Sequence, residues 1–191
     1  MSAWPAFQVD LRARLGREFA QLSAALAAPG DALRRRPEPN AWSALEVVEH
    51  VALTNHFLSL LAKKLVDKAL ARSRRGDPTP SEPPSLAHLD TLAARAFRWQ
   101  HPTHMTPTGS ADPIELRARL AEQHDRLAAW LDALPHGAGS LHRIRISVVE
   151  GDDRLDFYQL LHFVLLHVAR HRAQLARAIE DVNRTAPRPD A

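Results

Sequence analysis

Four long segments of this chain carry apolar residues at every third or fourth position, which is the spacing of one face of an α-helix. The segments cover residues 9–28, 44–71, 113–134 and 157–182. An amphipathic helix must bury its apolar face against another element, and long helices do so readily against each other. We therefore predict an all-α protein in which these four helices share one core.

Three of the four segments begin with a capping sequence, in which a short polar side chain accepts a hydrogen bond from the first turn of the helix. The capping residues are, in chain order, Ser43 with Glu46, Asp112, and Asp156 with Gln159. Both pairs have the spacing of a capping box, and a proline suited to the first helical position follows Asp112. These signals predict helix starts at residues 44, 113 and 157.

The connections between the four segments differ in length. Residues 72–112 are rich in proline and contain one weaker helical pattern at 86–99. Residues 141–148 alternate apolar and polar side chains, which predicts a short extended stretch. Four long helices joined by long crossovers predict a four-helix bundle that is not simply up-down-up-down.

The composition is that of an ordinary globular domain. Of 191 residues, 45% are hydrophobic and 25% are charged, with a formal net charge of +3. We expect one domain over residues 1–185 and a flexible tail at 186–191. No secretory signal pattern is present at the N-terminus, and no stretch approaches the roughly 18 apolar residues of a membrane span. The expected location is the cytoplasm, with no membrane partner.

The arrangement of the basic residues and the absence of cysteine exclude further classes of function. The basic clusters at 34–36 and 72–75 are short and lie beside proline or glycine, so they do not form the basic stripe that nucleic-acid binding requires. We therefore expect no nucleic-acid partner. The chain has no cysteine, which excludes disulfides, thiolate metal ligands and a cysteine nucleophile.

His167 and His171 lie four residues apart in the predicted fourth helix, so their imidazoles project from one side of it, one turn apart. At this separation two ring nitrogens can reach a single metal ion. Two adjacent imidazoles on a mostly apolar helix are costly to bury without a shared partner, which favours a metal. The alternative is a partly exposed pair that lines a groove. A third metal ligand must come from another element.

The best candidate for the third ligand is His50, which falls within the apolar stripe of the predicted second helix. The alternative is a histidine at the edge of the core, hydrogen-bonded to a neighbour. His56 and Glu49 lie on the polar side of the same helix and are predicted to be exposed, as is His162 on the fourth helix. His124 flanks the apolar stripe of the third helix and is a candidate for lining a cavity.

Two local patterns resemble the DinB/YfiT-like family. The sequence WSALEVVEHV, residues 42–51, is similar to the Trp-Ser…Glu…His-Leu segment that opens the second helix of these proteins. The sequence HVARHRAQL, residues 167–175, is similar to their His-x-x-x-His-x-x-Gln-Leu segment on the fourth helix. The order, the separation and the chain length also fit, so the resemblance covers most of the chain.

The resemblance implies a four-helix bundle with up-down-down-up connectivity, and often a homodimer. It also implies a divalent metal held by three histidines, here His50, His167 and His171. Zinc is the expected metal, with nickel, iron or manganese as alternatives. Nitrogen-only ligation suits zinc, nickel or iron better than magnesium or calcium.

Three neutral imidazoles leave at least one coordination position open, which is the catalytic arrangement of zinc. Some family members are thiol-dependent S-transferases, so we expect a metal-dependent transferase that ionises a low-molecular-weight thiol as its small-molecule substrate. One alternative is a metal-dependent hydrolase, for which the sequence identifies no carboxylate base. Another is a non-catalytic, stress-associated metal-binding dimer. Tyr158, Arg172 and Gln174 are candidate pocket residues whose roles the sequence does not assign.

Overall fold

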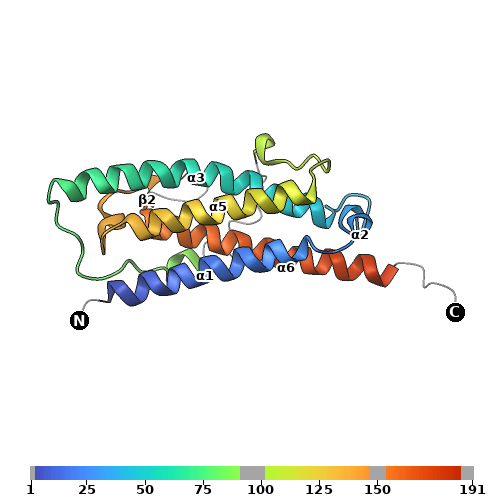
Figure 1. The fold of residues 1–191 in the computed structure, drawn as a ribbon, viewed down its shortest axis with the longest axis horizontal. Coiled ribbons are helices and arrows are strands. Elements are labelled where there is room, and N and C mark those ends of the chain that lie inside the picture. The colour runs from blue at the N-terminus through green and yellow to red at the C-terminus, as the bar shows by residue number, and fades with distance from the viewer. Residues whose placement is uncertain (1–2, 91–101, 147–153, 186–191) are drawn as a thin grey trace.

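The computed structural model describes residues 3–90, 102–146 and 154–185 (Figure 1). In chain order its elements are α1 (Trp4–Ala25), α2 (Gly30–Arg34), α3 (Ala44–Arg74), the 3-10 turn η1 (Thr103–Met105), α5 (Pro113–Ala133), the 3-10 turn η2 (Ala138–Leu141), β1 (Ile144–Arg145), β2 (Arg154–Leu155) and α6 (Phe157–Thr185). The two short strands lie between α5 and α6 in the chain and form an antiparallel pair. The protein is all-α, as the sequence predicts.

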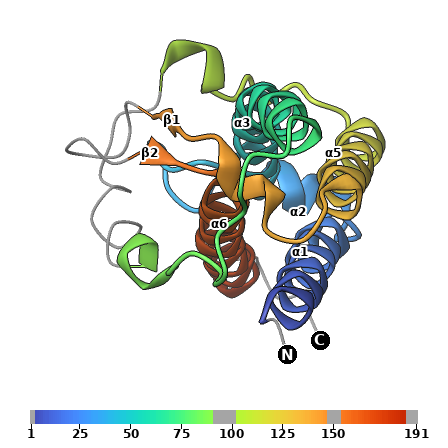
Figure 2. The ribbon, with the colours of Figure 1, turned by 90° about the vertical axis from the view of Figure 1, so that its left-hand side faces the viewer.

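The helices α1, α3, α5 and α6 lie side by side and form a bundle (Figures 1 and 2). The colours of Figure 1 show that α1 and α6 run in one direction along the bundle and that α3 and α5 run in the other. α3 packs against α5 and α6, and α1 packs against the same two helices. The end-on view of Figure 2 accordingly places α1 and α3 diagonally. This is the expected up-down-down-up connectivity.

Because α3 and α5 run in the same direction, the chain between them must travel back along the bundle. Residues 75–112 make this crossover, which includes helical residues 87–90 and the turn η1. The helical piece predicted at 86–99 is seen only at its start, since residues 91–101 lie outside the described part of the chain. An extended stretch was predicted at 141–148, and within its described residues only those of β1 form a strand. Residues 147 and 148 lie outside the described part of the chain.

All three predicted caps are present. The Ser43 side chain accepts a hydrogen bond from the Glu46 backbone, and the Glu46 carboxylate accepts one from the Ser43 backbone. Asp156 and Gln159 make the same reciprocal pair at the start of α6. The Asp112 side chain accepts two backbone hydrogen bonds from the first turn of α5. The predicted starts of α3, α5 and α6 are therefore confirmed to the residue.

The first helix begins earlier than its apolar pattern predicts, at Trp4 instead of residue 9. Trp4 is buried, and its ring centroid lies 5.7 Å from that of Phe7 and 5.1 Å from that of Tyr158. Its indole nitrogen donates a hydrogen bond to the Pro80 carbonyl at 3.0 Å. These contacts with distant segments stabilise an extra turn that local periodicity does not reveal. The helix also ends before the predicted boundary, at Ala25.

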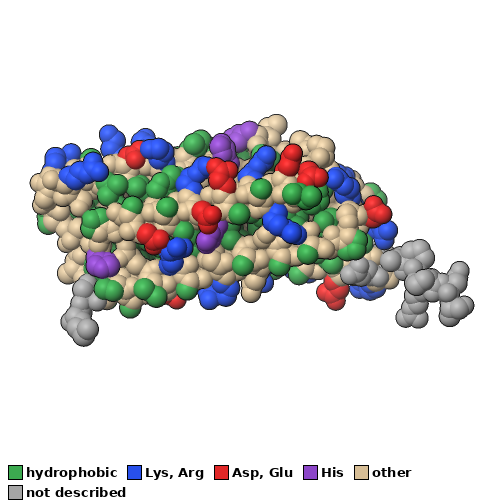
Figure 3. All heavy atoms as spheres, in the orientation of Figure 1, with side chains coloured by type: hydrophobic (Ala, Val, Ile, Leu, Met, Phe, Trp, Pro, Cys, Tyr) green, Lys and Arg blue, Asp and Glu red, His purple; other side chains and the backbone are tan. Residues whose placement is uncertain are grey.

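The outer faces of the helices carry mixed charge. On the face shown in Figure 3, side chains of Lys and Arg alternate with those of Asp and Glu, and hydrophobic side chains are scattered among them. Ion pairs join neighbouring turns, as between Lys63 and Asp67, or neighbouring helices, as between Arg12 and Asp132 at 3.1 Å. Among the residues that the structure describes, none of the helices combines the length and the apolar composition of a membrane-spanning segment.

Candidate metal centre

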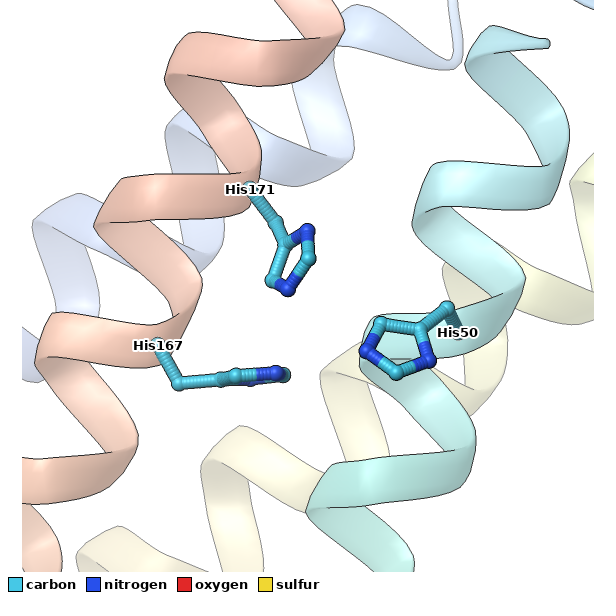
Figure 4. Close-up of side chains that lie close together, drawn as sticks. All are labelled: His50, His167 and His171. Carbon is cyan, nitrogen blue, oxygen red and sulfur yellow. The ribbon is translucent and has the colours of Figure 1, made fainter. Parts of the chain in front are cut away.

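Three histidines from two adjacent antiparallel helices meet inside the bundle (Figure 4). His50 lies on α3, in the second turn after its cap, and His167 and His171 lie one turn apart on α6. Their exposed fractions are 5%, 5% and 8%. One ring nitrogen of each lies within 4.8 Å of the others, so the three side chains could hold one metal ion. The sequence-predicted candidates are thus brought together.

Two of the three imidazoles have their outer nitrogen held by an acceptor. Nδ1 of His50 lies 2.8 Å from the carbonyl oxygen of Met105, and Nδ1 of His171 lies 3.0 Å from Oε1 of Gln174. A carbonyl oxygen can only accept, so each Nδ1 carries the proton and donates it. In a neutral imidazole with this tautomer the lone pair lies on Nε2. Figure 4 shows a ring nitrogen of each of these histidines pointing toward the shared space. Acceptors of this kind orient histidine ligands in metal sites.

The third imidazole, His167, is kept neutral by its surroundings. The pKa of His167 lies well below its ordinary value, mainly because the side chain is buried. The neighbouring His171 and His50 lower this pKa further. Metal ligation requires neutral imidazoles with a free lone pair. Three imidazole nitrogens form a donor set suited to zinc, nickel or iron. The chemistry of the residues present therefore fits a divalent metal of this class.

Trp42 lies beside the histidine cluster, and Glu46 lies close to it along α3. The Trp42 ring is partly exposed, and its centroid lies 5.0 Å from that of His50. Glu46 is buried one turn before His50, where it completes the cap and binds Arg36 through both carboxylate oxygens. Burial raises the pKa of Glu46, but the hydrogen bonds from Arg36 and Ser43 outweigh it and lower that pKa overall. Its capping role, which the sequence predicts, is confirmed.

Glu49 is not exposed, and that prediction was wrong. Only 6% of its surface is exposed. Its carboxylate accepts a hydrogen bond from the Thr108 hydroxyl at 2.8 Å and another from the Gly109 backbone at 2.9 Å. The physical reason is that the crossover packs against the start of α3. A helical wheel that assigns one face to the core and the other to water misses this second buried side.

The prediction for His162 was wrong for the same reason. Its exposed fraction is 2%, and the side chains of Asp90 and Arg14 both contact its ring. Nδ1 accepts from the Arg14 guanidinium at 3.1 Å, so Nε2 carries the proton and donates it to Asp90 at 2.8 Å. His162 thus joins α6 to α1 and to the crossover, outside the histidine cluster.

The remaining candidates lie elsewhere. His56 is exposed, as predicted. His124 lines a cavity of about 240 Å³ between α1 and α5, with Gly16 and Phe19, and does not belong to the histidine cluster. Arg172 pairs with Glu18 at 3.1 Å, and Tyr158 is buried against Trp4. Of the three candidate pocket residues, only Gln174 contacts the cluster.

Sequence reasoning missed the contributions of the crossover. The Met105 carbonyl, the Thr108 hydroxyl and the Gly109 amide all act on α3, and two of the three are backbone groups. A backbone group can be supplied by any residue, so no residue-type pattern reveals it. The only signal in the sequence is the glycine at position 109, which takes a positive φ of 74°.

Comparison with known proteins gives one match, to a family model. No curated protein and no solved structure matches the chain significantly. The family model of the DinB superfamily matches residues 11–175, which include the whole histidine cluster and all four long helices in large part. Since the match spans most of the chain, this protein belongs to the DinB superfamily.

Proposed function

We propose that this protein binds a divalent metal through His50, His167 and His171, and uses it in a thiol S-transferase reaction. Zinc is the metal that we propose first. The observation that carries the proposal is the convergence of three buried imidazoles, two of which have their outer nitrogen held by an acceptor. Three imidazoles leave a position of tetrahedral zinc open for substrate, which is typical of catalytic sites.

When bound, zinc would act as a Lewis acid and would lower the pKa of a substrate thiol. The protein's own residues orient the histidines: the Met105 carbonyl accepts a hydrogen bond from His50, and Gln174 accepts one from His171. Trp42 offers an aromatic surface beside His50 for the substrate. In the transfer the thiol loses its proton, a bond forms between sulfur and the electrophilic atom, and the leaving group departs with its electron pair.

The carboxylates near the cluster on α3 are already engaged in other contacts, which favours the transferase reaction over hydrolysis. A metal-dependent hydrolase is helped by a carboxylate that takes a proton from the bound water. Glu46 is held by Arg36 and by its own helix cap, and both oxygens of Glu49 accept hydrogen bonds from the crossover. A thiol ionised at the metal needs no such base, because its proton passes to solvent.

Metal binding is tested first, on protein purified without a histidine tag. We expect near-stoichiometric zinc in the purified protein and its loss when His50, His167 or His171 is replaced by Ala. His56→Ala is the matched control, since His56 lies exposed on the same helix as His50. Absence of metal, together with a melting temperature that zinc and nickel leave unchanged, would refute the metal site.

Catalysis is tested next, on the zinc-loaded protein. We expect consumption of a low-molecular-weight thiol when an electrophile is present, and no consumption above background by the His167→Ala variant. If the loaded protein turns over no thiol across a panel of thiols and electrophiles, the transferase proposal fails. The protein would then be a metal-binding bundle without this activity.

A further inference from the structure

The crossover segment Thr103–Ala111 contacts the start of α3 next to the histidine cluster. Its Met105 carbonyl accepts the hydrogen bond from His50. Farther along it, the carbonyls of Gly109 and Ala111 accept hydrogen bonds from the Arg34 guanidinium at 3.1 and 3.3 Å. The segment is thus held at one end by α2 and reaches the ring of His50 at the other.

Glu49 makes the central contact of this segment. Its two carboxylate oxygens accept from two consecutive residues, the Thr108 hydroxyl and the Gly109 amide. Hydrogen bonds to an ionised carboxylate are roughly twice as strong as neutral ones. Glu49 is buried, so losing these donors would leave a desolvated charge without partners, which is costly. The carboxylate therefore ties the segment to α3 one residue before His50.

Gly109 shows how closely the segment approaches α3. Its φ of 74° lies in the left-handed region, where a side chain is disfavoured. A Cβ at this position would also come within 3.3 Å of Oε1 of Glu46. Glu46 is held in place by Arg36, so it does not readily move aside. The backbone at Gly109 is therefore seated between the two glutamates of the first turns of α3.

We propose that Glu49 is a positioning residue for the metal centre: by anchoring Thr108 and Gly109 it holds the Met105 carbonyl against His50 and so aims Nε2 of His50 at the metal. This inference rests on the proposed metal binding. Loss of an outer hydrogen-bond partner of a histidine ligand typically weakens metal affinity 10- to 100-fold. Coupling of this kind is reciprocal, so metal bound to His50 must in turn stabilise the segment.

The test uses the full chain and measures zinc affinity by competition with a chromophoric chelator. Glu49→Gln retains the size of the side chain but can accept through only one atom. We expect it to weaken zinc affinity by about 10- to 100-fold. Thr108→Ala removes one hydrogen bond from an exposed position and is expected to weaken it less. Asp67→Asn, which removes a carboxylate from an exposed position of α3, is the matched control and should leave the affinity unchanged.

Hydrogen exchange of the Gly109 amide gives a second readout that does not depend on activity. We expect zinc to slow this exchange in the wild-type protein and to slow it much less in Glu49→Gln. If the segment exchanges faster in Glu49→Gln while zinc affinity equals that of the wild type, the positioning role is refuted and the metal site stands. If the wild type binds no zinc, the proposed function fails, and this inference with it. Thr108→Ala keeps the test decisive should Glu49→Gln not fold.

Discussion

Nδ1 of His50 lies 2.8 Å from the carbonyl oxygen of Met105, although the two residues are 55 positions apart in the chain. His50 belongs to α3 and Met105 to the turn η1 of the crossover. A histidine held at one nitrogen presents the other in a defined direction. The part of the crossover that the structure describes therefore helps to shape the candidate metal centre through a backbone carbonyl.

Replacing Gln174 by Ala is expected to weaken zinc binding by about tenfold or more, because Nδ1 of His171 then loses its acceptor. Gln174→Glu retains an acceptor and is expected to keep most of the affinity. Chelator competition measures both variants, with the exposed Gln21→Ala on α1 as control. Equal affinity in Gln174→Ala and wild type would show that Gln174 does not orient His171.

The metal-free protein is expected to lose stability as the pH falls below about 6.5, the ordinary pKa of histidine. Burial holds the pKa of His167 well below this value. Between the two pKa values the unfolded chain binds a proton that the folded protein does not, so acid favours unfolding. The free energy of unfolding falls by up to about 1.4 kcal/mol per pH unit for this group.

Urea denaturation between pH 7.5 and 5 in the presence of a chelator measures this dependence. His167→Gln removes the titrating group and is expected to make the curve less steep. The pKa of His162 is also lowered, chiefly by burial, so a residual slope of stability against pH remains in every variant. An identical slope in wild type and His167→Gln would contradict the assignment.

Gly139→Ala is expected to lower the free energy of unfolding by about 1–3 kcal/mol, as overpacked core substitutions do. A Cβ at Gly139 would lie 2.7 Å from two ring atoms of Tyr158, which is fully buried and cannot move aside easily. Gly30→Ala is the control, because a Cβ there meets nothing within 4 Å. Thermal or urea unfolding of the two variants should therefore differ, and equal stabilities would argue against this packing.

Tyr158 is the only tyrosine of the chain, so its ionisation can be followed directly by ultraviolet absorbance. Burial, aided by the charge of Asp156, raises the pKa of Tyr158 to about 12. In urea the midpoint should return to about 10. Above that pH the unfolded chain releases a proton that the folded protein retains, so stability falls with rising pH. A midpoint near 10 in the folded protein would show that Tyr158 is not buried.

Local features of this protein could be predicted because they depend on residues close together in the chain. The caps at Ser43, Asp112 and Asp156 form between a side chain and the turn that follows it, so they were located to the residue. The pairing of His167 with His171 is of the same kind, since helix geometry alone places them one turn apart. The family motifs that include these residues are local for the same reason.

The surroundings of these local features depend on contacts between distant segments, which only the folded protein shows. His50 meets His167 and His171 because α3 and α6 are adjacent and antiparallel, which periodicity does not reveal. Glu49 and His162 are buried because the crossover covers sides of α3 and α6 that their helical wheels leave to water. The long helices, the caps of three of them and the inward-facing histidines could be read from local sequence patterns. The packing of the crossover against α3 settled how His50 is held, because that contact joins residues far apart in the chain.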